Sequence, residues 1–253
     1  MQIPESPRAI FRNSPLIEVV CQIRFPTILK IALPPIEFQE RIRSAYPGYN
    51  EKKDYGQTFP NIVGQVQVFN APAVHEFVSS DGHEIISLTR EFLALTCRRY
   101  GRWEDFSSKW QMAQDALVEC YQPNYIERVG LRYQDVLSRK RLGIESVAWK
   151  ELLRPEIAGL FGVWEEKAIK ESFSQSLLSL EDNNNQVRVV HGLFPLEDGE
   201  VAYLIDTDFF HEGRLKIEDI RAKLHGFNRS AGNLFRWCIS STLHDALAPE
   251  TAT

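Results

Sequence analysis

Paired cysteines, long apolar runs and a leader segment are all missing from this sequence of 253 residues. No window approaches the roughly 18 uncharged apolar residues that a membrane helix needs, and residues 1–14 have neither a basic nor an apolar leader region. We therefore expect a cytoplasmic protein with no membrane partner. The cysteines lie far apart among apolar neighbours without any C-x-x-C spacing, which predicts reduced core thiols rather than disulfides or a zinc knuckle; they are Cys21, Cys97, Cys120 and Cys238.

Signature motifs of several enzyme classes are also missing. The chain has no G-x-x-x-x-G-K-[ST] or G-x-G-x-x-G phosphate loop, no G-x-S-x-G nucleophile elbow and no H-E-x-x-H helix. These absences exclude nucleotide hydrolysis of the P-loop type, the α/β-hydrolase elbow and the zinc-protease helix. The sequence predicts no cofactor and favours a protein that is not an enzyme.

The composition is that of a globular protein. Apolar residues make up 43% of the chain, and 29 Lys and Arg against 34 Asp and Glu give a formal charge of −5. Disorder is excluded, and a surface that is basic throughout and binds nucleic acid is not favoured. A chain of this length forms either one large domain or two smaller ones.

Hydrophobic periodicity predicts strands in most of the first half. Residues 16–25 alternate with period two, and the spacing after Pro35 predicts a short helix that ends before Pro47. Four more strands follow, and their short connections require an antiparallel meander because a parallel return needs a dozen residues or more. Asp81-Gly82 predicts a type I′ hairpin turn within it. The four strands are expected at 62–69, 74–79, 84–89 and 92–99.

A strongly amphipathic helix is expected at 102–121, where apolar residues recur at steps of three and four. Its two tryptophans favour packing on a sheet over a stacking platform for bases. Residues 125–137 then predict a strand with Arg128 and Arg132 on one face and Tyr133 on the other.

The second half predicts short helices at 144–161, three strands and two C-terminal helices. The strands are expected at 172–180, 187–194 and 201–208, and the helices at 217–227 and 234–243, with a break or kink at the glycine-bearing segment 226–232. The charged, glycine-bearing residues 139–143 are the best boundary between halves. We therefore predict an α+β fold with a mainly antiparallel sheet or sheets and helices packed on one face, its halves 1–138 and 139–253 forming one integrated domain.

Four sequence blocks together resemble an uncharacterised family of sporadically distributed bacterial and archaeal proteins of about this length. The blocks span residues 14–25, 128–133, 204–209 and 224–244. The resemblance covers most of the chain and brings no activity, substrate or catalytic residue with it. It implies a single module in an accessory or mobile-element gene, such as one in phage defence. The middle block departs from the family pattern at Gln134-Asp135, where an Asn-containing continuation is expected.

Asp206 and Asp208 form the most notable acidic pair. They stand two residues apart at the end of a predicted strand, so their carboxylates share a face and can share a cation. Together with His211, Glu212 and either Glu200 or His191 they suggest a metal-dependent phosphodiesterase. The alternative, which we favour, is that the pair caps a loop after the strand.

Two histidines flank the predicted hairpin. Cross-strand pairing would bring His75 and Glu76 toward His83 and Glu84, a set that suits Zn²⁺. The same residues equally suit the solvated face of an exposed hairpin, which is the interpretation we favour.

Arginines form the third candidate site. Arg128 and Arg132 project to the same strand face, and with Arg98 or Arg99 they suit an anionic ligand, gripped bidentately. The alternatives are solvated arginines, or an Arg132 buried in an ion pair with Glu127, Asp135 or an acidic residue of a neighbouring strand. The leading hypothesis is a non-enzymatic binding or regulatory module that recognises a protein partner, a second copy of itself or an anionic ligand. The alternative is a metal-dependent hydrolase or nuclease that uses Asp206 and Asp208.

Overall fold

The computed structural model describes residues 1–53, 73–181 and 184–251. The chain forms two compact units, which we call unit 1 (Met1–Val19, Gly130–Glu212, Arg221–Thr253) and unit 2 (Val20–Val129, Gly213–Ile220). Their boundaries fall within strands and helix starts, and none falls at residues 139–143. No helix in the described part of the chain is long and apolar enough to cross a membrane.

The described strands form a nine-stranded sheet in the order β3-β4-β5-β6-β2-β7-β10-β9-β8 and a two-stranded sheet of β1 and β11. With the helices they make the α+β fold with an antiparallel sheet that the sequence predicts. The strands are β1 (Ala9–Phe11), β2 (Leu16–Arg24), β3 (Gly48–Lys53), β4 (Ala73–Val78), β5 (Glu84–Leu88), β6 (Phe92–Cys97), β7 (Ile126–Leu137), β8 (Phe173–Ser179), β9 (Asn185–Pro195), β10 (Val201–Leu215) and β11 (Pro249–Thr251).

The longest helices are α2 and α6. The α-helices are α1 (Ile36–Ile42), α2 (Trp103–Tyr121), α3 (Arg139–Leu142), α4 (Trp149–Leu152), α5 (Pro155–Ala158), α6 (Ile220–Cys238) and α7 (Ser241–Ala246). The described residues also form four 3₁₀ helices, namely η1 (Leu29–Ala32), η2 (Gly159–Gly162), η3 (Glu166–Ala168) and η4 (Ile217–Asp219).

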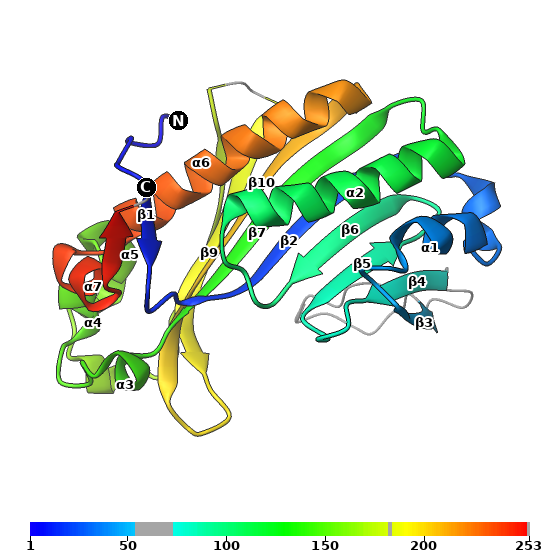
Figure 1. Cartoon of the computed structure of the whole chain (residues 1–253). Helices are drawn as coiled ribbons and strands as arrows, with labels where there is room; N and C mark the ends of the chain where they lie inside the picture. The colour runs from blue at the N-terminus through cyan, green and yellow to red at the C-terminus, as the bar shows by residue number, and fades with distance from the viewer. Residues whose placement is uncertain (54–72, 182–183, 252–253) are drawn as a thin grey trace. The chain divides into compact units, whose positions relative to one another are not determined.

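Unit 2 is built on an antiparallel meander. Strands β4, β5 and β6 pair in sequence, which confirms three of the four predicted strands, and β3 pairs with β4 at the end of the series. The strand predicted at 62–69 lies outside the described residues. Helix α2 packs on β6 and α1 (Figure 1), with Phe106, Trp110 and Leu117 buried. The tryptophan stripe is therefore core, as the spacing predicts.

The Asp81-Gly82 hairpin is present, but its predicted turn type is wrong. Gly82 donates its N–H to the Ser79 carbonyl at 2.9 Å and has φ +72°. Asp81 does not share the positive φ that a type I′ turn requires at both central positions. Its carboxylate accepts instead from Ser79 Oγ and the His83 N–H, so side-chain bonds shape a longer loop.

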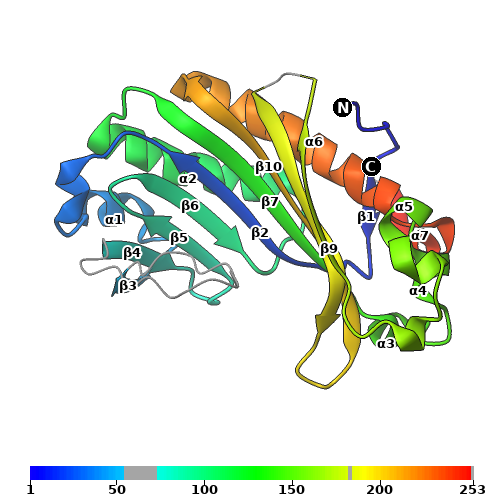
Figure 2. The same cartoon turned by 180° about the vertical axis from the view of Figure 1, so that it is seen from behind.

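Unit 1 joins β8, β9 and β10 in antiparallel register with helices on one face. Phe209 of β10 stacks against Phe227 of α6, and Tyr133 of β7 donates its hydroxyl to Asn228 of the same helix. Seen from behind (Figure 2), β9 and β10 lie in front of α6. Strands β1 and β11 pair the two ends of the chain, an element the sequence analysis missed because each has only three residues.

The predicted break at 226–232 is wrong, since α6 runs unbroken from Ile220 to Cys238. A glycine in a helix interior costs only about 1 kcal/mol, and the buried stripe continues through the segment at helical spacing: Ile220, Leu224, Phe227, Ala231, Leu234 and Cys238. The break comes at Ser240, whose side chain caps α7 by accepting from the Leu243 N–H.

The four cysteines are free thiols. Three of them are buried, namely Cys21, Cys97 and Cys238, and Cys120 is partly exposed. The predicted core location is therefore confirmed for three of the four cysteines, and Cys120 is the exception.

Candidate functional site

Strand alternation divides the unit 1 sheet into two faces. Phe209 and Tyr203 of β10 point to the face that carries α6, α4 and η2, since they contact Phe227, Trp149 and Phe161. The residues between them, such as Asp206 and Asp208, therefore point to the opposite face. We call that opposite surface of β8, β9, β10 and the unit 1 part of β7 the open face.

Arg132 and Asp206 form an ion pair on the open face. Arg132 Nε donates to Asp206 Oδ1 at 2.8 Å, Nη2 bonds Oδ2, and Gln134 Nε2 donates to Oδ2 at 3.1 Å. The Arg132 side chain is 33% exposed and that of Asp206 is 7% exposed. The structure therefore realises the alternative in which Arg132 pairs with an acidic residue of a neighbouring strand, and it joins two residues that the sequence analysis placed in separate sites.

The ion pair affects the pKa of both arginine and a nearby buried carboxyl. The hydrogen bond to Asp206 raises the pKa of Arg132 above its usual value, and burial of the guanidinium opposes that effect only in part. Asp135 is buried on the opposite face of β7. Burial, and secondarily the charge of Asp206, raises the pKa of Asp135 to about 8.

The proposed metal ligands do not converge. Asp206 and Asp208 lie in the middle of β10, which continues to Leu215, so the expectation that they end a strand is wrong. His211 and His191 point to the face opposite the two aspartates, by their register on β10 and β9. Glu200 instead accepts from Ser138 and the Lys140 N–H. Among the described residues no group of three or more His, Cys, Asp or Glu is placed to hold a metal.

His191 is held in the helix-covered layer by hydrogen bonds. Tyr203 donates its hydroxyl to the Ile157 carbonyl at 3.0 Å, so His191 Nδ1, 2.8 Å from the same oxygen, must be the donor to it. Burial lowers the pKa of His191. Packing and the bond to Tyr203 account for His191 here, and no metal is needed to explain its position.

Arg188 is the residue of the open face that the sequence analysis missed. It lies on β9, half-buried, directly opposite Asp208 on one side and Leu177 on the other. Its Nε–H is buried and has no hydrogen-bond acceptor among the residues that the structure describes. The sequence feature that could have identified it is its position as a charged residue among the valines of the strand predicted at 187–194.

The other predicted arginines belong to unit 2. Arg98 and Arg99 are exposed and follow β6, and Arg128 lies near the start of β7. Arg128 and Arg132 do share a face of β7, as predicted, because they alternate with the buried Val129 and Leu131. The structure does not bring Arg98 or Arg99 together with Arg132 within one unit.

The two histidines of the hairpin do not meet. The register pairs His75 with Leu88 and Val78 with Ile85, so His83 stands several residues further along the hairpin. His75 is 2% exposed and lies between the Tyr49 hydroxyl and the Ile31 carbonyl. The expectation that cross-strand pairing brings the two imidazoles within reach is wrong.

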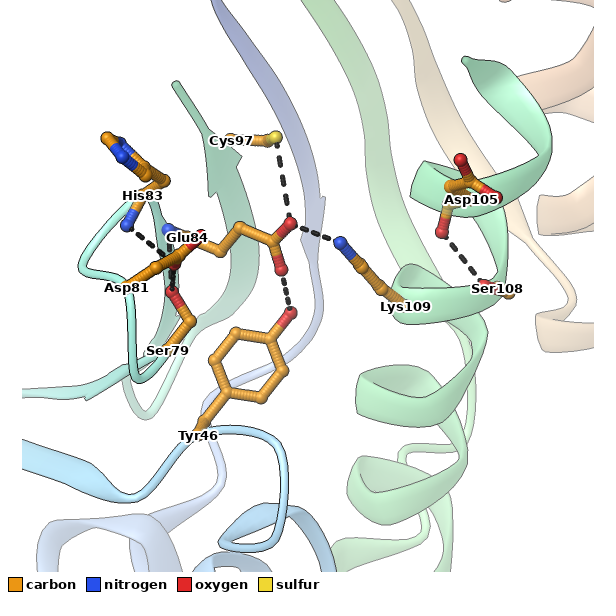
Figure 3. Close-up of polar contacts among 9 residues, drawn as sticks. All are labelled: Tyr46, Ser79, Asp81, His83, Glu84, Cys97, Asp105, Ser108 and Lys109. Atoms are coloured by element: carbon orange, nitrogen blue, oxygen red, sulfur yellow. Dashed lines mark hydrogen bonds and ion pairs between the residues drawn. The ribbon is translucent and has the colours of Figure 1, made fainter. Parts of the chain in front are cut away.

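Glu84 is instead the centre of a polar cluster in unit 2 (Figure 3). Tyr46 donates its hydroxyl to Glu84 Oε2 at 2.9 Å, Lys109 Nζ forms an ion pair with Oε1, and Cys97 Sγ lies 3.9 Å from Oε1. Burial, strengthened by the Glu84 charge, raises the pKa of Tyr46, and burial also raises that of the Cys97 thiol. The thiol and the phenol stay protonated, and the carboxylate is paired with the ammonium of Lys109. The cluster therefore links β5 to α2 and supplies no nucleophile.

Comparison with known proteins adds no assignment. No protein-family model matches the chain, and no curated protein matches its sequence. The family resemblance of the four sequence blocks therefore stays a prediction.

Proposed function

We propose that this protein is a non-enzymatic binding module that recognises an acidic segment of a protein partner on the open face of unit 1. The observation that carries the proposal is Arg188, whose buried Nε–H has no acceptor among the described residues. Such a role suits an accessory component of a multigene system, which is what the family resemblance implies.

The buried Nε–H of Arg188, which has no acceptor among the described residues, is costly for the free protein. A buried donor without an acceptor costs about 1–3 kcal/mol, and more when the group is charged. A carboxylate of a partner that accepts from Nε and one terminal nitrogen would remove that cost once the side chain turns its buried Nε outward, since this planar two-bond geometry is the one that arginine favours.

The surroundings of Arg188 favour a protein segment over nucleic acid. Leu177, directly opposite on β8, has an exposed fraction of 55%, and Phe173 on the same face of β8 has 69%. Apolar side chains beside a cation suit an acidic segment with apolar residues. Nucleic-acid binding requires several cations that contact phosphates, whereas the neighbouring Arg132 is already paired with Asp206.

The test is binding of a short fluorescein-labelled peptide of Glu and Leu, measured by fluorescence anisotropy against native protein and Arg188→Ala. We expect binding that weakens with added salt and a Kd at least about tenfold higher in the variant, equivalent to about 1.4 kcal/mol. The matched control is Arg12→Ala, which removes an exposed arginine of unit 1 that pairs with Glu250.

Equal affinity of native protein and Arg188→Ala would refute the proposal. So would preferential binding of a labelled single-stranded oligonucleotide in the same assay. A loss of affinity in Arg12→Ala as large as that in Arg188→Ala would show that the peptide follows surface charge in general.

A further inference from the structure

Strand β8 is an open edge of the nine-stranded sheet. It is last in the order of the described strands, and its one partner among them is β9. Six of its seven residues are exposed, including the large apolar side chains of Phe173 and Leu177. A long exposed edge with apolar residues is a template for pairing with another strand.

The hydrogen bonds to β9 determine which backbone groups of β8 face outward. In the continuous register, Leu180 donates its N–H to Asn185 and the Ser172 carbonyl accepts from Leu193. In an antiparallel pair, residues that hydrogen-bond the neighbouring strand alternate with residues that do not. The even-numbered residues of β8 therefore bond β9, and the odd-numbered ones present their N–H and C=O groups to the free edge. The Ser179 carbonyl accepts from the amino group of Met1 at 2.9 Å, so the free stretch is centred on Gln175.

The side chains of this stretch are symmetric about Gln175. Reading outward in both directions, the chain has a serine on each side and then an apolar residue on each side, Phe173 and Leu177. An antiparallel pair of two such strands centred on Gln175 places Phe173 opposite Leu177 of the other copy, with Gln175 opposite its own equivalent. All three of these pairs use outward-facing backbone groups, so the side-chain symmetry and the hydrogen-bond alternation select the same register.

We propose that β8 pairs with β8 of a second copy of this chain, in antiparallel register about a two-fold axis at Gln175. A two-fold contact needs a surface that complements itself. This stretch complements itself both in the order of its polar and apolar side chains and in the alternation of its outward backbone groups. It also contains no Lys, Asp, Glu or Pro, the residues that commonly protect edges. At the opposite end of the order, β3 carries Glu51 and Lys52, and Lys52 pairs with Glu76 of β4.

The pairing goes beyond the proposed function, because it uses the edge of β8 and not the guanidinium of Arg188. Arg188→Ala is therefore expected to keep the dimer, and blocking the edge is expected to leave Arg188 in place. Failure of one proposal is thus distinguishable from failure of the other.

The first test is the mass of the full chain in solution, by sedimentation equilibrium over protein concentrations up to about 100 µM, where the weak interface expected of one strand pair is populated. We expect a reversible monomer–dimer equilibrium. Gln175→Pro removes an outward N–H but no bond to β9, and it should raise the dimer Kd at least about tenfold. Gln175→Thr keeps the N–H and should retain the dimer.

A second variant keeps the proposal falsifiable if proline disturbs the strand. Gln175→Cys places two thiols on opposed residues about 5.5 Å apart between Cα atoms, within disulfide range. With a mild copper–phenanthroline oxidant the two thiols should give up two electrons to the oxidant and two protons to water, and the S–S bond that forms gives a covalent dimer. Phe173→Cys is the control, since its two thiols would stand four residues apart along the strands. The native chain treated with the same oxidant shows how much cross-linking comes from the four cysteines already in the sequence.

Three results would overturn the proposal: a native chain that stays monomeric at the highest concentration, a dimer that persists with unchanged Kd in folded Gln175→Pro, or cross-linking of Phe173→Cys that equals or exceeds that of Gln175→Cys. Loss of the dimer in Gln175→Thr as complete as in Gln175→Pro would overturn the main-chain pairing as well.

Discussion

The two units treat buried charge in opposite ways. In unit 2 the Glu84 carboxylate meets an ammonium, a phenol and a thiol (Figure 3), so its polar atoms are matched inside the fold. In unit 1 the charges of Arg132 and Asp206 are matched, but the buried Nε–H of Arg188 on β9 has no acceptor among the described residues. The difference teaches that burial of a charge does not mark a binding site by itself. An unmatched charge does, because its missing partner has to come from outside the fold.

The largest expected effect comes from breaking the matched pair of unit 1. Arg132→Met leaves Asp206 buried without its counter-charge, so the free energy of unfolding should fall by about 3–5 kcal/mol, measured by urea denaturation. The double variant Arg132→Met/Asp206→Leu removes both charges and should recover much of that loss. A single-variant loss below about 1 kcal/mol would show that the pair behaves as a surface pair.

Removing the centre of the unit 2 cluster should have the next largest effect. Glu84→Ala leaves the hydroxyl of Tyr46 buried without its acceptor and Lys109 without its counter-charge, at a cost of about 2–3 kcal/mol in urea denaturation. Lys109→Ala is the comparison variant. It also leaves the Glu84 carboxylate, 12% exposed, without its counter-charge, but it should cost less than Glu84→Ala because Tyr46 keeps its acceptor and the ammonium that is removed is 44% exposed. Equal costs would mean that the ammonium, and not the buried phenol, needs the carboxylate.

Asp135 predicts a pH dependence that belongs to unit 1. Its pKa is raised to about 8 in the folded state, above an unfolded value of about 3.9, so the folded protein holds a proton that the unfolded chain has released. Stability contributed by this group is present at low pH and is lost as pH rises from about 4 to about 8, at no more than about 1.4 kcal/mol per pH unit. Asp135→Asn should flatten that slope in urea denaturation series across the same range. An unchanged slope would contradict the assignment.

The smallest expected effect tests the comparison most directly. Arg188→Met replaces the unmatched guanidinium with an apolar side chain of similar length, so the free energy of unfolding should rise by about 1 kcal/mol while peptide binding is lost. Thermal unfolding monitored by circular dichroism measures it. A clear fall in stability would show that Arg188 supports the fold of unit 1, and the contrast between the two units would then disappear.

Much of the fold was predictable because its strands and long helices show their period. The alternation in β2 and β7 and the stripe of α2 mark elements with one buried face, where the spacing of apolar residues is a direct consequence of geometry. Strand β3 was missed because its residues Glu51 and Lys52 are exposed and carry no such stripe. Only its pairing with β4 makes it a strand.

The sequence by itself determined the α+β class, the antiparallel meander, the inward and outward faces of β7 and the absence of common enzyme motifs. Each of these follows from local spacing or from connection length. The tertiary structure decided which charges meet. It paired Arg132 with Asp206 across 74 positions of sequence, turned His191 and His211 away from the aspartates, and left the buried Nε–H of Arg188 without an acceptor among the described residues. Those outcomes depend on strand order and register, and local spacing does not specify which strand lies beside which.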